Sequence, residues 1–181
     1  MVIKYLRDKY PSAKVPVLLA FFNFCEGSTQ TPANVVRSLL AQLLRQSGRV
    51  SDMLMALYER YAHSPHLPLE DLWSTLHSDI ASFDRVFIIF DALDEYVYGS
   101  EGFVNDFQNL FKLPMTSLFV TSRPTSLNKA ILGNFAQLEI LARDSELREY
   151  IQTRLSESRF NNRPELCNEV VQTILHQSNG V

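Results

Sequence analysis

The sequence has few of the residues that build disulfide scaffolds, zinc sites or membrane segments. Its two cysteines, Cys25 and Cys167, lie far apart and form no CxxC pair, which argues against a disulfide framework and favours a reducing compartment. No apolar run approaches the roughly 20 residues that span a membrane. The charged, amphipathic N-terminus also lacks the apolar core of a signal peptide. We therefore expect a cytoplasmic protein with no membrane partner.

Neither sign of charge dominates the chain. There are 17 lysines and arginines against 20 aspartates and glutamates, for a formal net charge of −3. The basic residues are scattered, so the electrostatic footprint of a nucleic-acid-binding protein is missing, and we expect no nucleic-acid partner. With 181 residues, 46% of them hydrophobic, the chain is long enough for one domain with a sizeable core.

Apolar runs of strand length alternate with amphipathic helices along the chain. The predicted strands cover about 15–24, 86–90, 117–121 and 137–141, and predicted helices begin the chain and separate these strands. The clearest helix follows Thr31 and Pro32, a good cap and a good first residue, and ends at Gly48. Further short helices are expected at about 102–111 and 127–132; Asp144 is expected to cap another helix, and Pro164 to open the last one. This alternation predicts an α/β fold in which helices cover both faces of a mostly parallel sheet, in three layers.

Charged residues follow two of the predicted strands. The stretch VFIIFDALDE runs from a buried strand into Asp91, with Asp94 and Glu95 three and four positions later. The stretch LFVTSRP carries Arg123 just beyond the next predicted strand. Because ligands bind beyond the carboxyl ends of the strands in such sheets, we expect these side chains to line one edge.

An apolar strand that ends in aspartate is the way in which P-loop NTPases hold Mg²⁺. In this interpretation Asp91 is the metal ligand, Glu95 is the base that orients a water, and Asp94 supports Glu95 or touches the metal shell. The cofactor-binding candidates follow the second strand: Thr121, Ser122 and Arg123, whose guanidinium suits a γ-phosphate. The competing interpretation is that an acid after a buried strand only starts a loop or caps a helix.

These stretches resemble a known family. VFIIFDALDE resembles the Walker B motif of NACHT ATPases, which belong to the STAND class of P-loop NTPases, and LFVTSRP resembles their sensor-1 strand. The runs FFNFCEGSTQTPANVVRSLLAQLL and LEILARDSELREYIQTRL are similar to nephrocystin-like N-terminal NACHT modules of fungal NOD-like receptor proteins. The resemblance implies a partial nucleotide-binding domain over 1–160, with Walker B at 86–95 and sensor-1 at 117–123. It implies that 161–181 begin the helical subdomain that follows.

The resemblance also implies a nucleotide-dependent signalling switch. Its cofactors would be Mg²⁺ and ATP or GTP. Its protein partners would be effector and repeat domains in the same chain and further copies in a homo-oligomer.

One required motif is missing from the sequence. A P-loop, GxxxxGK[ST], cradles phosphates with backbone N–H groups and a lysine, but none of the six glycines here is followed by lysine. We therefore expect an incomplete P-loop NTPase fold without its P-loop strand, from an incomplete gene model or a degenerate paralogue. Open sheet edges beside the sensor-1 and 137–141 strands would then lower stability and favour aggregation or recruitment of a strand from another chain.

Two functions stay open for such a chain, and a third finds little support. One is a nucleotide switch whose P-loop is supplied upstream, with these residues alone not catalytic. The other is a degenerate, non-catalytic fragment that binds relatives as a decoy. An unrelated α/β enzyme would need a nucleophile elbow, a metal cluster or a dinucleotide-binding glycine loop, and the sequence offers none of these.

Overall fold

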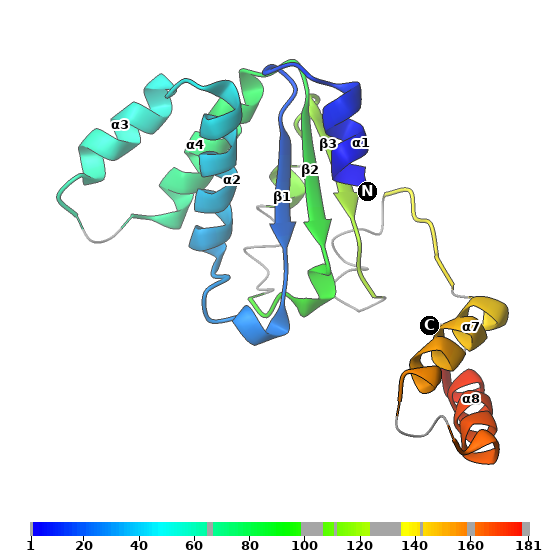
Figure 1. Ribbon diagram of the computed structural model, residues 1–181. Helices are drawn as coiled ribbons and strands as arrows, with labels where there is room; N and C mark the ends of the chain where they lie inside the picture. Colours follow the sequence, from blue (N-terminus) through cyan, green and yellow to red (C-terminus); the bar gives the residue numbers. More distant parts are fainter. Residues whose placement is uncertain are drawn as a thin grey trace. The chain divides into compact units, whose positions relative to one another are not determined.

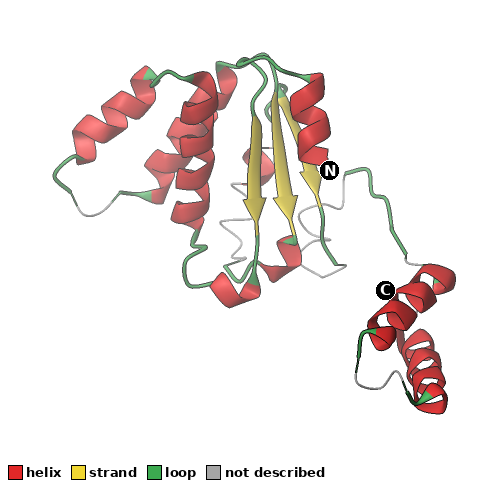
Figure 2. Cartoon of the chain, viewed as in Figure 1, coloured by secondary structure: helices red, strands yellow, loops and turns green. Residues whose placement is uncertain are grey.

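The computed structural model describes residues 2–64, 67–98, 107–110, 112–123, 135–141, 143–158 and 162–178. These residues belong to two compact units, Met1–Asn134 and Phe135–Val181. The first unit contains α1 (Val2–Lys9), β1 (Val17–Phe21), η1 (Phe24–Glu26), α2 (Pro32–Ser47), α3 (Asp52–Tyr61), α4 (Leu69–Ala81), β2 (Val86–Asp91), η2 (Leu93–Glu95) and β3 (Thr116–Val120). The second contains α7 (Asp144–Ser156) and α8 (Pro164–Ser178) (Figures 1 and 2).

The three described strands form one parallel sheet in the order β1-β2-β3. Leu18 lies beside Ile88 and Ile88 beside Leu118, so the central strand β2 is paired along both sides. Each crossover between neighbouring strands contains helix, as parallel pairing requires. The predicted α/β fold with a parallel sheet is therefore confirmed.

Helices lie on both faces of this sheet (Figure 1). On one face, Val86, Ile88 and Phe90 of β2 are fully buried in a core to which α2 and α4 contribute the leucines Leu39, Leu43, Leu72 and Leu76. On the other face, the Phe87 ring lies 5.1 Å from that of Tyr10, the residue that follows α1. Alternate residues of β2 thus face opposite layers, which explains why its sequence is apolar throughout.

Helix α2 begins and ends where its sequence predicts. The Thr31 hydroxyl accepts a hydrogen bond from the Asn34 N–H, Pro32 occupies the first turn, and Gly48 ends the helix with φ 66° in the left-handed region. Glycine is favoured there because its missing side chain removes the steric cost of that conformation. These caps fix where α2 begins and ends.

The two outer edges of the sheet differ. Along β1, glutamine side chains of α2 hydrogen-bond the outward backbone groups: Gln46 to Val17 and Gln42 to Leu19. Along β3, no described residue bonds to the outward backbone groups of Leu118 and Val120. The expected open edge beside this strand is therefore present among the described residues, whereas the β1 edge is protected against strand addition.

One predicted strand is wrong. Residues 137–141 form no strand, and Leu138 and Ile140 are 85% and 84% exposed. An apolar run becomes a strand only when another strand satisfies its backbone groups, and no described strand does so here. The helix predicted at 127–132 lies outside the described residues, and that at 102–111 is described only at 107–110, which are helical.

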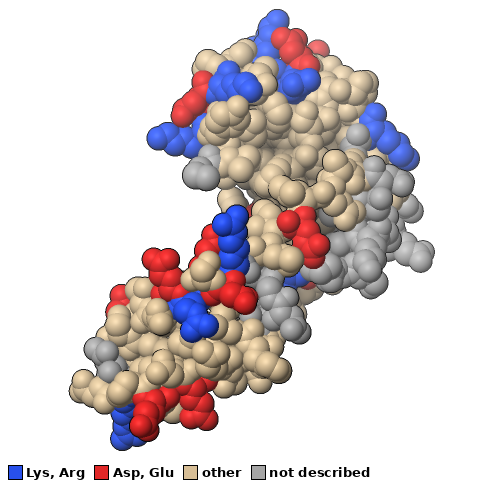
Figure 3. All heavy atoms as spheres, turned by 90° about the vertical axis from the view of Figure 1, so that its right-hand side faces the viewer, with Lys and Arg blue, Asp and Glu red and all other residues tan. Residues whose placement is uncertain are grey.

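The second unit is a pair of helices that contact each other, with Ile151 of α7 and Val171 of α8 buried. Helix α8 begins at Pro164 as predicted, whereas Asp144 is the first residue of α7 and Arg143, not Asp144, stands at the capping position. Among the described residues, no helix has the length and apolar character needed to cross a bilayer. Figure 3 shows basic and acidic side chains interspersed over the described part of the surface that it presents.

Candidate functional site

The carboxyl end of β2 turns sharply through Ala92. This residue has φ 55° and ψ 48°, a left-handed conformation that is uncommon for any residue other than glycine. The turn leads into η2, where the buried Leu93 anchors the loop by donating its N–H to the Thr121 C=O at 3.0 Å. Asp94 and Glu95 of η2 are thereby brought back to the strand ends beside Asp91. We call Asp91, Asp94, Glu95, Thr121, Ser122 and Arg123 the strand-end cluster.

Asp91 is held by the residue that follows β3. The Thr121 hydroxyl donates a hydrogen bond to Asp91 Oδ1 and accepts one from the Ala92 N–H at 3.0 Å. The Thr121 N–H in turn donates to the Phe90 C=O at 2.9 Å. One threonine therefore fixes both the carboxylate and the strained turn beside it, while no described residue bonds to Asp91 Oδ2.

Asp94 is the counter-ion of Arg123. Arg123 Nε donates to Asp94 Oδ2 at 2.6 Å, and the Arg123 N–H donates to Asp94 Oδ1 at 3.0 Å. Burial of Asp94 alone would raise its pKa, but these hydrogen bonds outweigh burial and hold the pKa below its ordinary value. The same contact raises the pKa of the Arg123 side chain. Asp94 is therefore a charged, fully engaged carboxylate, which suits a positioning role.

Glu95 faces two partners. Its Oε2 accepts a hydrogen bond from the Phe24 N–H at 3.1 Å, and its Oε1 lies 3.8 Å from an Nη of Arg123. The first contact connects η2, which follows β2, to η1, which follows β1, so the segments after all three strands are joined. The Ser122 hydroxyl completes the cluster with a long bond of 3.4 Å to Asp94 Oδ1.

The donor set of the cluster fits Mg²⁺ at Asp91 and does not favour it at Asp94. Magnesium prefers oxygen ligands, keeps several waters and needs only one or two carboxylates; Asp91 offers Oδ2 at the end of a rigid strand. Both oxygens of Asp94 are used by Arg123 and Ser122. Within the described ranges, no group of three or more histidine, cysteine, aspartate or glutamate side chains is arranged to hold a metal ion.

The structure thus brings together all six residues that the sequence singles out, while their catalytic and binding roles stay predictions. Sequence reasoning missed two of the contacts. The Phe24 donor is a backbone N–H, which nearly every residue type has, so its hydrogen bond to Glu95 could not be predicted from the sequence. The pairing of Asp94 with Arg123 was detectable, since opposite charges after neighbouring parallel strands are expected to meet.

Comparison with known protein families gives a match over most of the chain. A family model described as Nephrocystin 3, N-terminal matches residues 1–123, a stretch that contains the whole strand-end cluster. No curated protein and no solved structure matches the chain. The match covers 123 of 181 residues, about two thirds of the sequence. The chain therefore belongs to the nephrocystin 3 N-terminal family.

Proposed function

We propose that this chain is part of the nucleotide-binding domain of a NACHT-type signalling switch of the STAND class of P-loop NTPases. The observation that carries the proposal is the convergence of acidic and basic side chains at the carboxyl ends of β2 and β3, where α/β sheets bind ligands. The Walker B and sensor-1 resemblances describe the same two strand ends. The family match supports the nephrocystin-like part of this assignment.

Each residue of the strand-end cluster has a role in this proposal. Asp91 would hold Mg²⁺ directly or through water; when bound, the ion would neutralise charge on the phosphates of ATP or GTP. Glu95 orients the attacking water and accepts its proton. Asp94 positions Arg123, which pairs with the γ-phosphate, and Thr121 and Ser122 donate hydrogen bonds at the same edge.

The test uses the protein translated from its native transcript, whose 5′ end is mapped first. Glu95→Gln should bind Mg·ATP or Mg·GTP about as tightly as wild type and lose at least 100-fold in hydrolysis, because orientation of the water is lost while the metal ligand remains. Glu59→Gln, an exposed change on α3, is the matched control and should hydrolyse normally. Unchanged turnover in Glu95→Gln would refute the assigned role.

A second candidate function is protein binding without catalysis. It is favoured by the lack of any glycine–lysine pair in the sequence, since a triphosphate loses most of its charge stabilisation without the P-loop donors and lysine. The open β3 edge would then recruit a strand of a complete relative. Co-purification of the chain with a complete family member, without nucleotide dependence, would support this role, and no association would count against it.

A further inference from the structure

Two glutamines of α2 act as clamps on the outer edge of β1. Gln46 Oε1 accepts the Val17 N–H at 2.9 Å, and its Nε2 donates to the Val17 C=O at 3.0 Å. Gln42 repeats this at Leu19, with both hydrogen bonds at 2.8 Å. Each carboxamide thus takes the place of one residue of a neighbouring strand.

The spacing of the clamps sets a register between helix and strand. Four residues of α-helix rise about 6.0 Å, and two residues of strand rise about 6.6 Å. Each step of four back along α2 therefore matches a step of two forward along β1. The next step after Gln46–Val17 and Gln42–Leu19 joins position 38 to Phe21, and position 38 is a serine.

Ser38 is too short to act as a third clamp. Its Oγ instead accepts a hydrogen bond from Gln42 Nε2 at 3.3 Å, which leaves its hydroxyl hydrogen available to donate. The Phe21 N–H faces outward, as the N–H groups of Val17 and Leu19 do, and no described residue accepts from it. The Phe21 C=O is already paired, with Gln30 Nε2 at 2.8 Å. This third step therefore presents two donors and no acceptor.

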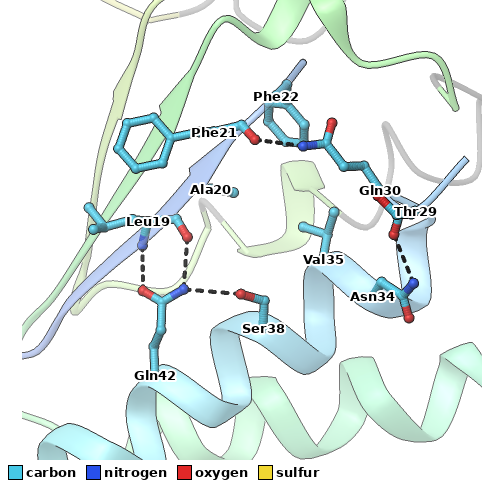
Figure 4. A pocket seen from close by; sticks show the side chains of 10 residues that line it. All are labelled: Leu19, Ala20, Phe21, Phe22, Thr29, Gln30, Asn34, Val35, Ser38 and Gln42. Atoms are coloured by element: carbon cyan, nitrogen blue, oxygen red, sulfur yellow. Dashed lines mark hydrogen bonds between the residues drawn. The ribbon is translucent and has the colours of Figure 1, made fainter. Parts of the chain in front are cut away.

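A cavity of about 370 Å³ lies at the third step (Figure 4). Its walls include Phe21 and Ser38 and the apolar side chains of Ala20, Phe22 and Val35. Asn34 also lines it, and the Arg37 guanidinium donates to Asn34 Oδ1 at 3.1 Å, so a cation stands close by. The volume is in the range of small-ligand pockets.

We infer that this cavity binds a carboxylate carried on a short apolar stem. One carboxylate oxygen accepts from the Phe21 N–H and the other from the Ser38 hydroxyl, while the stem contacts the apolar walls. A carboxamide fits less well, because its NH₂ group would find the Phe21 C=O already engaged. Two sources carry this chemistry: a free short-chain acid and the carboxyl terminus of a peptide.

The test follows the backbone amide signals of the full chain by NMR during titration. Sodium butanoate should shift the Phe21 signal saturably, and butanamide should bind at least tenfold more weakly. A tripeptide with a free carboxyl terminus, compared with its amidated form, distinguishes the sources: tighter binding than butanoate indicates a protein terminus, and weaker binding a free acid. No saturable, carboxylate-dependent shift with either probe would overturn the inference.

Variants at position 38 make the test specific. Ser38→Gln should place its side-chain oxygen at the Phe21 N–H, occupy the carboxylate position and lower butanoate affinity at least tenfold. It should leave the chain folded, as seen in unchanged signals from β2 and β3. Ser38→Ala removes one donor without filling the cavity and should weaken binding severalfold. Butanoate binding to Ser38→Gln at wild-type affinity would contradict the site. The inference does not depend on the proposed nucleotide function, so Glu95→Gln should bind butanoate normally.

Discussion

Arg123 and Asp94 join the ends of two neighbouring strands, with Nε and Oδ2 2.6 Å apart. The Asp94 side chain is only 7% exposed, whereas that of Arg123 is 74% exposed. The carboxylate is therefore the fixed member of the pair and the guanidinium the one that reaches towards solvent. This asymmetry suits a residue that positions an arginine for a ligand at the sheet edge.

Asp94→Asn should lower the free energy of unfolding by about 1 kcal/mol at pH 7, since charge-assisted hydrogen bonds are lost but solvent screens the exposed partner. The folded pKa of Asp94 lies below its ordinary value of 3.8. Its contribution is therefore full above that value and is lost as the pH falls through the folded pKa. Urea unfolding should give a lower free energy of unfolding for Asp94→Asn than for wild type at pH 7. In strong acid the two proteins should have equal stability.

The control for this change is Glu157→Gln, which removes the partner of Arg154 from an exposed pair 3.5 Å apart. Exposed pairs of this kind contribute little. No measurable loss is expected from it. Equal losses in Asp94→Asn and Glu157→Gln would contradict the distinction between the two pairs.

Thr121→Val should cost about 1–3 kcal/mol, because it leaves Asp91 Oδ1 and the Ala92 N–H without their shared partner while keeping the shape of the side chain. Thr121→Ser keeps the hydroxyl and should cost clearly less. Thermal or denaturant unfolding of the two variants measures the difference. A Thr121→Val protein as stable as Thr121→Ser would mean that the hydroxyl does not hold the turn.

Asp79→Asn should stabilise the fold at neutral pH. Asp79 is buried in α4, and burial raises its pKa more than the hydrogen bond from Ser51 lowers it. A raised folded pKa means that charging Asp79 costs stability as the pH rises from its ordinary value of 3.8 upwards. The amide should therefore gain about 1 kcal/mol at pH 7 and nothing in strong acid. A variant that is less stable than wild type at pH 7 would contradict this sign.

Replacing both clamps, Gln42→Leu with Gln46→Leu, should expose the β1 edge. Loss of the four hydrogen bonds to β1 should cost about 2–4 kcal/mol in all, and light scattering should detect self-association at lower concentration than for wild type. Gln172→Leu adds one leucine to the exposed side of α8 and serves as the control for added apolar surface. Self-association in the control alone would refute the protective role.

Much of the fold is predictable because its strands are rich in apolar residues and the central strand β2 is buried along most of its length. Continuous apolar runs marked β1, β2 and β3, and the caps at Thr31 and Gly48 marked α2. The segment QLEIL at 137–141 alternates polar and apolar residues, a pattern that also suits a strand, but it forms none, so local sequence alone could not decide its structure. A strand forms only beside a neighbouring strand, and the sequence of one segment does not show whether such a neighbour is present.

The site was predictable in position but not in detail. Parallel strands end at a common edge, so Asp91 and Arg123 had to lie near one another. Which carboxylate pairs with Arg123 depends on the left-handed turn at Ala92. Alanine rarely adopts that conformation, so the sequence does not predict it. The clamps have a clear sequence signal, glutamines four apart on a helix, but their target strand is known only from the packing of α2.

The most direct test of the central claim is Mg²⁺-dependent ATP and GTP hydrolysis by the protein translated from its native transcript. Asp91→Asn, at the carboxyl end of β2, is compared with Asp84→Asn, an exposed acid just before the same strand. If Asp91 is the metal ligand, its variant should lose at least 100-fold in turnover while Asp84→Asn stays at the wild-type level. Wild-type turnover in Asp91→Asn, or equal loss in both variants, would contradict a nucleotide site at the strand-end cluster.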